Sequence, residues 1–84
     1  MVAYSIYDNK AEIYQEPIFY KEDREIIDAI TYSFTQEDYE EVQANEFDIF
    51  KLGEYNTFNG KFDLLESPKH LFNVQDIIKQ QKDK

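Results

Sequence analysis

The segment that most constrains the fold is residues 47–66, which read FDIFKLGEYNTFNGKFDLLE. Two apolar-rich runs flank Asn59-Gly60, and both of these residues tolerate the positive φ that a tight hairpin turn requires. We therefore predict two antiparallel strands joined by a turn at Asn59-Gly60. Gly53, in the middle of the first run, indicates a bulge or a close approach of another backbone segment.

The first twenty residues also follow a strand pattern. Residues 2–8, VAYSIYD, alternate between two faces. A turn at residues 8–10 leads to a second predicted strand at residues 11–15. Pro17 indicates that this strand ends there or lies at a sheet edge, because proline cannot donate to a sheet ladder. Residues 18–20, Ile-Phe-Tyr, read as a short apolar anchor that leads into a helix.

The period then changes to that of an α-helix. Ile26, Ile30 and Phe34 recur at a spacing of four, which places them on one helical face. Asp23 is the candidate N-cap, since a carboxylate there accepts hydrogen bonds from the first free N–H groups. We expect the helix to end near residues 35–36.

The remaining segments are less regular. Residues 37–46 are consistent with a short second helix, with Tyr39 and Val42 inward, or with an ordered loop. Ser67-Pro68 reads as an interruption after the hairpin, and residues 69–73 as a short final strand. Residues 74–80 then predict a helical turn whose inward positions are Val74, Ile77 and Ile78.

Together these segments predict an α+β fold. Its sheet is small and mostly antiparallel, with four to five strands in the order β-β-α-β-β. One main amphipathic helix packs on one face, and a short helix ends the chain. We expect a single domain over residues 1–84, with residues 81–84 frayed. The expected core joins the helix to the hairpin strands through Ile26, Ile30, Phe34, Phe50, Leu52, Phe62 and Leu64.

The net charge of −9 is concentrated in one part of the chain. Residues 22–48 hold ten acidic residues and one basic residue, whereas residues 1–21 carry −1 and residues 49–84 carry +1. The chain has no cysteine, no apolar run near 18 residues and no signal-peptide pattern at its start. We therefore expect a protein of a reducing, intracellular compartment without a membrane segment.

The residues that carry chemistry do not form a recognisable catalytic or metal-binding pattern. One histidine and no cysteine leave only carboxylates as metal ligands, and no calcium-loop spacing occurs. His70 follows a Pro-Lys turn and is interpreted as an exposed or half-buried structural residue. No serine has a recognisable base and orienting group beside it. We expect a non-enzymatic protein with no cofactor and no bound metal.

Single-stranded nucleic acid is a candidate ligand despite the negative charge. Aromatic side chains on a sheet can stack on bases, which adds about 1–3 kcal/mol per base. Nearby lysines outside the acidic segment would contact phosphates. The alternative is that the tyrosines only cover the second face of a thin sheet. The candidate residues are Tyr4, Tyr7, Tyr14, Tyr55, Lys10, Lys51, Lys61 and Lys69.

The acidic segment allows a different function. It can be a solvated face that keeps a small protein soluble, or a docking face for a basic partner. In the second case the chain would be a protein–protein adaptor, or a nucleic-acid mimic, that binds a host or viral protein through residues 22–48. The candidate docking residues are Glu37, Asp38, Glu40 and Glu41.

Three segments, YSIYDNKAEIY, FDIFKLGEYNTFNGKF and LLESPKHL, resemble the small nonstructural protein of gokushovirus-type microviruses, which are single-stranded DNA phages. The resemblance covers nearly the whole chain. The chain departs from the family pattern in its heavy acidic segment and in Pro17-Ile18-Phe19, where the family has a Pro-Phe pair. The matching positions are Tyr4, Asp8, Pro17, Phe47, Leu52, Gly53, Tyr55, Gly60, Glu66 and Pro68.

The resemblance implies a DNA-binding or replication-associated role in the host cytoplasm, when viral single strands are made and packaged. It implies partners among host or viral replication and packaging proteins, with single-stranded DNA as a further ligand. It transfers no catalytic residue. An edge strand in so small a sheet also allows self-pairing into a homo-oligomer.

Overall fold

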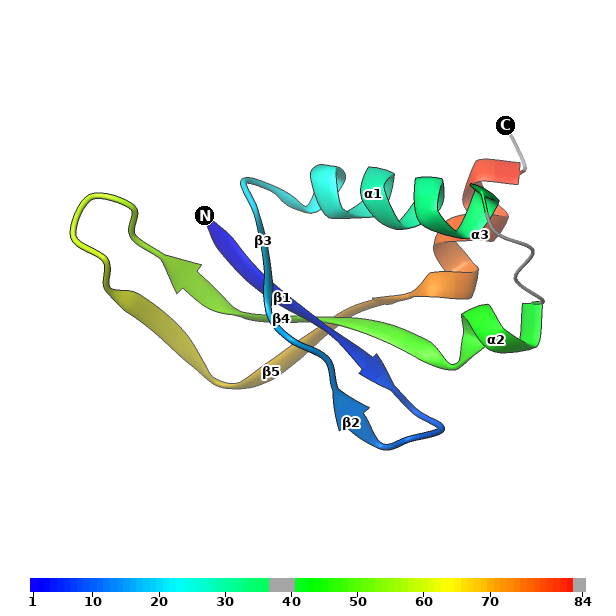
Figure 1. The fold of residues 1–84 in the computed structure, drawn as a ribbon, viewed down its shortest axis with the longest axis horizontal. Coiled ribbons are helices and arrows are strands. Elements are labelled where there is room, and N and C mark those ends of the chain that lie inside the picture. Colours follow the sequence, from blue (N-terminus) through cyan, green and yellow to red (C-terminus); the bar gives the residue numbers. More distant parts are fainter. Residues whose placement is uncertain (37–40, 83–84) are drawn as a thin grey trace.

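The computed structural model describes residues 1–36 and 41–82, and it shows a curled antiparallel sheet with helices on one side (Figure 1). The molecule extends 41 × 28 × 17 Å, so it is one sheet and one helical layer thick. The α+β class predicted from the sequence is confirmed. The elements in chain order are β1 (Val2–Asp8), β2 (Ile13–Tyr14), β3 (Ile18–Tyr20), α1 (Asp23–Gln36), α2 (Glu41–Asn45), β4 (Phe47–Tyr55), β5 (Phe62–Asn73) and α3 (Val74–Lys82).

The sheet has the strand order β2-β1-β4-β5, and β3 also pairs with β1, on the same side as β2. All pairings are antiparallel. Residues 18–20, read from the sequence as an apolar anchor, are therefore a strand. The predicted second strand at residues 11–15 is reduced to two residues, because Glu12 takes a positive φ of 60° at the end of the turn.

The core lies between the sheet and the helices, over the half of the sheet that Figure 1 shows on the right. Ile26 and Ile30 on α1 are buried, as predicted, and Phe34 packs against them. Val74 and Ile77 on α3 are also buried, as predicted, with Ile78 partly buried. The buried hydrophobic residues of this cluster are Tyr4, Ile26, Ile30, Ala44, Ile49, Val74 and Ile77.

The predicted inward face of the hairpin strands is wrong. Ile49, not Phe50, is the β4 residue in the core, while Phe62 and Leu64 are exposed. Side chains alternate between the faces of a strand, so an error of one residue exchanges the two faces. The register of β4 against β1 also shifts between Ala3 and Tyr4, where Leu52 is the extra residue. This bulge changes the phase of the alternation in the middle of β4.

The strand β5 continues through Ser67-Pro68, which the sequence presented as an interruption. It does so by bulging: Gly53 pairs with Leu64 and Lys51 pairs with Lys69, so four residues of β5 lie opposite one residue of β4. Pro68 falls inside this bulge and at the edge of the sheet, where its missing N–H removes no ladder bond. The bend of β5 is visible in Figure 1.

Gly53 lies where the backbones of β4 and β5 approach closely, as its position in the sequence indicated. A Cβ atom built at Gly53 would lie 2.4 Å from the carbonyl oxygen of Asp63 and 2.8 Å from the Cα of Leu64. Both are backbone atoms that cannot move aside without opening the strand pair. Glycine is therefore required here for space.

The hairpin turn is longer than predicted. Residues 56–61 form the connection, and Gly60 alone of the predicted pair takes a positive φ, of 72°. The Asn56 carboxamide oxygen accepts hydrogen bonds from the backbone N–H groups of Phe58 and Asn59, at 2.8 and 3.3 Å. The side chain of Asn56 thus shapes a loop that sequence reasoning assigned to Asn59-Gly60.

Helix α1 begins at the predicted residue, with Glu22 at the N-cap position. The backbone N–H of Lys21 donates to the Glu25 carboxylate at 2.8 Å, which fixes the entry into the helix. Asp23, predicted as the cap, instead accepts a hydrogen bond from the Tyr4 hydroxyl at 2.6 Å. The segment predicted as a helix or a loop contains α2, while Tyr39 lies outside the described residues.

Candidate nucleic-acid interface

The side of the sheet opposite the helices is rich in aromatic rings. Directly paired residues of neighbouring strands share a face. Ile6 and Ile49 pair and belong to the core side, so the adjacent pairs Ser5–Phe50 and Tyr7–Asp48 belong to the opposite side. We call this opposite side the uncovered face.

One group of rings on the uncovered face joins four strands. The Tyr7 and Tyr14 ring centroids are 4.6 Å apart, and Phe50 lies 6.0 and 5.4 Å from them. The His70 ring continues the group at 5.3 Å from Phe50. Tilted and edge-on ring contacts of this kind stabilise the group and leave part of each ring exposed to solvent. The first aromatic cluster therefore consists of Tyr7, Tyr14, Phe50 and His70, and Tyr14 is 48% exposed.

A second group lies at the hairpin end of the same face. The Tyr55 and Phe62 ring centroids are 4.8 Å apart, and Phe19 lies 6.0 and 6.1 Å from them. Phe19 pairs with Ala3, which itself pairs with Gly53, so the ring rises beside two residues with little or no side chain. The second aromatic cluster consists of Phe19, Tyr55 and Phe62, and Phe62 is 54% exposed.

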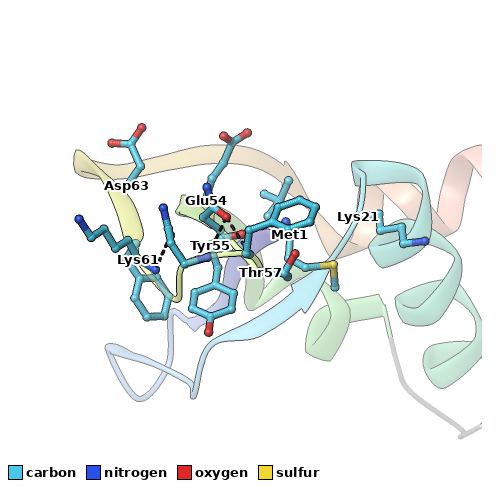
Figure 2. A pocket seen from close by; sticks show the side chains of 12 residues that line it. Met1, Lys21, Glu54, Tyr55, Thr57, Lys61 and Asp63 are labelled. Carbon is cyan, nitrogen blue, oxygen red and sulfur yellow. Dashed lines mark hydrogen bonds between the residues drawn. The ribbon is translucent and has the colours of Figure 1, made fainter.

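The hairpin end also forms an open depression (Figure 2). Tyr55 points to one side of the hairpin in this view, whereas Glu54 and Asp63 point to the other. Glu54 and Asp63 are a directly opposed pair. Alternation along the strands thus keeps both carboxylates away from the second aromatic cluster.

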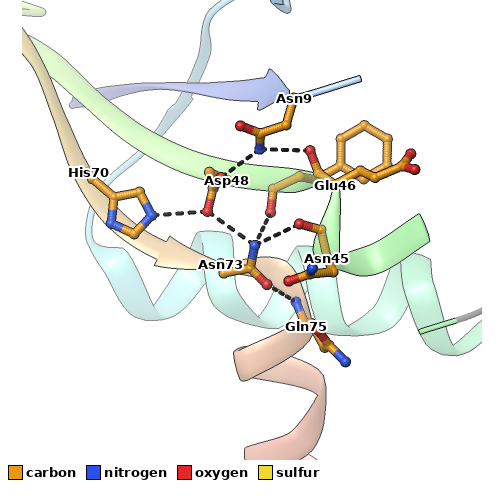
Figure 3. A network of polar contacts seen from close by, with 8 residues as sticks. Asn9, Asn45, Glu46, Asp48, His70, Asn73 and Gln75 are labelled. Carbon is orange, nitrogen blue, oxygen red and sulfur yellow. Dashed lines mark hydrogen bonds and ion pairs between the residues drawn. The ribbon is translucent and has the colours of Figure 1, made fainter. Parts of the chain in front are cut away.

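A polar network anchors His70 at the other end of the face (Figure 3). The Asp48 carboxylate contacts His70 Nε2 at 3.0 Å and accepts hydrogen bonds from the side-chain amides of Asn9, at 2.6 Å, and Asn73, at 3.1 Å. Partial burial raises the pKa of Asp48, but the hydrogen bonds outweigh it and hold the pKa below its usual value. Both carboxylate oxygens of Asp48 therefore already have hydrogen-bond partners within the protein.

Asn73 connects this network to α3. Its amide also donates to the carbonyl oxygens of Asn45 and Phe47, at 3.0 and 3.2 Å. Its own oxygen accepts the Gln75 N–H at 3.0 Å, which makes Asn73 the N-cap of α3. The ring of His70 thus stands on a region tied to both the sheet and the helices (Figure 3).

Three of the four tyrosines predicted as stacking platforms lie on the uncovered face: Tyr7, Tyr14 and Tyr55. The fourth, Tyr4, is a correction, because its side chain is 0% exposed in the core and no base can reach the ring. Burial and the hydrogen bond to Asp23 raise the pKa of Tyr4. Sequence reasoning grouped the four by residue type, although alternation along β1 separates Tyr4 from Tyr7.

Four other rings of the two clusters were missed as site residues: Phe19, Phe50, Phe62 and His70. Phe50 and Phe62 had been assigned to the core, and His70 to a structural role only. The exposed position predicted for His70 is confirmed. Alternation by two could not have found Phe50, because it lies five residues before Tyr55 and only the bulge at Leu52 brings both rings onto one face. Phe62 shares that face because it pairs with Tyr55 across the hairpin.

The predicted lysines divide between the two sides. Lys10 lies in the turn after β1, and Lys61 directly precedes Phe62 in the hairpin loop, so each adjoins one aromatic cluster. Lys51 pairs with Tyr4 and with Lys69, which places Lys51 and Lys69 on the helix side of the sheet. That placement is a correction, because the strand register separates this pair from the aromatic rings.

The predicted acidic docking face cannot be placed. Glu37, Asp38 and Glu40 lie outside the described residues, and Glu41 is the first residue of α2. Glu22, just before α1, and Asp28 on α1 are exposed. Among the acidic residues with a strand partner in the described part of the chain, Asp48 alone faces the uncovered side.

The uncovered face offers ring surfaces and two nearby amines. Within residues 1–36 and 41–82, no three histidine or acidic side chains gather in a way that could hold a metal ion. No helix in the same ranges is both long enough and apolar enough to cross a membrane. The chemistry available on this face is stacking, with phosphate contact at its two ends.

The architecture defines a small α+β protein with one helix-covered sheet face and one aromatic face. The family described as Phage ORF5 protein matches residues 1–77, so the chain belongs to this family of phage proteins. No curated protein matches the chain. No solved structure matches it either.

Proposed function

We propose that this phage protein binds single-stranded DNA weakly through its uncovered face. In this role it assists the synthesis or packaging of a single-stranded genome, in the host cytoplasm and without catalysing a reaction. The gokushovirus-type microvirus resemblance supports the genome type. The observation that carries the proposal is the pair of exposed aromatic clusters on one sheet face.

Base stacking is the interaction that can outweigh the electrostatic repulsion between the acidic protein and DNA. Each base stacked on an aromatic ring contributes about 1–3 kcal/mol, whatever the base. The net charge of −9 opposes binding, but the acidic excess belongs to residues 22–48, and on the uncovered face Asp48 is engaged by protein donors. Two or three stacked bases would therefore give weak, sequence-tolerant binding.

The test is a fluorescence titration of the protein with a labelled 30-mer single strand at low salt. We expect Tyr14→Ala and Phe62→Ala each to weaken binding about 5-fold or more. Both rings are about half exposed, so these changes spare the core. Tyr32→Ala is the matched control, since Tyr32 is an exposed tyrosine of α1 on the helix side. An absence of binding at high micromolar protein would contradict the proposal.

Exposed aromatic faces also serve as protein interfaces, so a second measurement separates the two roles. Sedimentation of the protein alone and with the 30-mer distinguishes self-association through the face from DNA binding. If the clusters form a dimer interface, Phe62→Ala should dissociate the dimer and leave DNA binding absent. If they bind DNA, the free protein should sediment as a monomer at the same concentration.

The adaptor alternative has its own support in two exposed acids of the helical layer, Glu22 just before α1 and Asp28 on it. A basic protein partner would dock there without touching the aromatic rings. Replacing Glu37, Glu40 and Glu41 with glutamine should then abolish capture of the partner from host lysate treated with nuclease. Unchanged capture would count against this function.

A further inference from the structure

The two aromatic clusters are separated along β1 and β4 by Ala3 and Gly53, which have little or no side chain. Phe50 in the first cluster and Tyr55 in the second are five residues apart on one strand, which corresponds to about 16 Å at 3.3 Å per residue. Between them, on the same face, Ala3 pairs with Gly53 across β1 and β4. The same row carries Phe19 on β3 and Leu64 on β5, where Leu64 is 65% exposed. A ligand that touches both clusters therefore crosses a short stretch of backbone between these two side chains.

Each cluster has a cation at its outer side. Lys10 stands in the turn that connects β1 to β2, the strands that carry Tyr7 and Tyr14. Lys61 directly precedes Phe62, and Figure 2 shows its side chain in the same loop region as Tyr55. The order along β1 and β4 is thus cation, rings, the Ala3–Gly53 pair, rings, cation.

We propose that the uncovered face is a two-anchor site for single-stranded DNA, in which bases at the two ends of one short segment stack on separate clusters and the sugar–phosphate backbone between them crosses Ala3 and Gly53. This inference rests on the proposed function and adds the footprint of the ligand. The 16 Å separation corresponds to about five nucleotides at the stacked spacing of about 3.4 Å per nucleotide, and to fewer when the strand is stretched. The bases over Ala3 and Gly53 contribute little, because neither residue offers a ring.

A two-anchor site differs from a single stacking patch in how affinity depends on base placement. Once one end of a strand is stacked, the second end is held near its cluster at a high effective concentration. Bases in the middle of the segment are then dispensable, whereas bases at both ends are required. Duplex DNA is excluded, since its bases are stacked and paired internally and cannot reach two separate clusters.

The experiment uses short thymidine strands with abasic spacers, titrated into the full chain by NMR. The two-ended strand carries two thymidines, three abasic sites and two thymidines. The one-ended strand carries four consecutive thymidines and three abasic sites, so base and phosphate counts are equal. We expect the two-ended strand to bind about 10-fold tighter than the one-ended strand.

Variants of single clusters complete the test. Tyr14→Ala or Phe62→Ala should reduce the preference for the two-ended strand to less than about 2-fold, while Tyr32→Ala should preserve it. The inference is overturned if the two strands bind alike, or if the preference survives Phe62→Ala, while the 30-mer still binds. If the 30-mer does not bind at all, the proposed function fails and the inference fails with it.

Discussion

Tyr4 joins the sheet to the first helix with a single side chain. Its ring is fully buried between β1 and the helices, and its hydroxyl donates to the Asp23 carboxylate at the start of α1. A buried hydroxyl needs such a partner, because leaving it unpaired costs free energy. The hydrogen bond therefore fixes where α1 begins relative to the sheet.

We expect Tyr4→Phe to lower the free energy of unfolding by about 1–2 kcal/mol, since the ring still fills the core while the bond to a charged acceptor is lost. Urea unfolding followed by circular dichroism measures the change. Tyr14→Phe is the matched control, because its ring lies on the exposed face. Equal stability of the two variants would show that the Tyr4–Asp23 bond contributes nothing.

Asp48 makes the stability depend on pH. The hydrogen bonds from His70, Asn9 and Asn73 favour the carboxylate and hold its pKa in the folded protein below the usual value of about 3.9. A lowered pKa means that this stabilisation is fully present above pH 4 and is lost as the pH falls through the folded-state pKa.

Asp48→Asn should accordingly lower the free energy of unfolding by about 1 kcal/mol at pH 6, and by less as the pH falls below 4. Unfolding curves of the variant and the parent protein at pH 6 and pH 3 measure this difference. Glu54→Gln, at an exposed position, controls for removing one charge from an acidic protein. A difference that grows at pH 3 would contradict the assignment.

At the scale of elements, the packing of β4 against β5 depends on Gly53. We expect Gly53→Ala to cost about 1–3 kcal/mol, because the new Cβ would overlap backbone atoms of Asp63 and Leu64. Chemical denaturation gives the value. Gly60→Asn is the control: asparagine tolerates a positive φ, and a Cβ there meets the Tyr55 hydroxyl at a comfortable 3.7 Å. A cost for Gly53→Ala no larger than for Gly60→Asn would refute the close approach.

Local sequence patterns predicted the helices and strands more accurately than the faces that these elements bury. The spacing of Ile26, Ile30 and Phe34 predicted α1 and its buried face, because a helix is specified by contacts within the segment. The inward face of β4 depends on Leu52, whose bulge arises only when β1 and β5 are both paired with β4. Such a register is a property of three strands together, and no single segment contains it.

The candidate site was predictable only in part, because its grouping also depends on the register of several strands. Tyr7, Tyr14 and Tyr55 were identified by residue type, whereas their grouping into two clusters required the strand pairing. Tyr4 was misplaced because a tyrosine in a strand can point either way, and its partner Asp23 lies 19 residues along the chain. The sequence pattern predicted an aromatic sheet face, and the strand register determines which residues lie on it.

At the scale of the whole molecule, the acids of α1 and the aromatic clusters lie on opposite sides of the sheet. The sequence concentrates its negative charge in residues 22–48, which include α1, while the rings gather on the opposite side of the sheet. Only Lys10 and Lys61, among the predicted lysines, adjoin those rings. Binding of single-stranded DNA should therefore depend mainly on stacking and only weakly on released counterions.

We expect the logarithm of the DNA affinity to fall with the logarithm of salt concentration with a slope of about −1.4, as two phosphate contacts on a single strand predict. Titrations of the 30-mer between 20 and 200 mM salt measure this slope. Over that range the Debye length falls from roughly 20 to 7 Å. Lys61→Gln should make the slope about −0.7. Lys69→Gln, on the helix side, should leave it unchanged, and a steep slope near −5 would indicate a different, basic surface.

The four-residue bulge of β5 also bears on self-association through the edge of the sheet. An outer strand with a regular ladder can recruit further chains and grow into fibrils. In β5 the ladder is broken opposite Leu52, and Pro68 withholds a donor inside the break. The interrupted ladder thus disfavours fibril growth through this edge, although several rings of the chain are exposed.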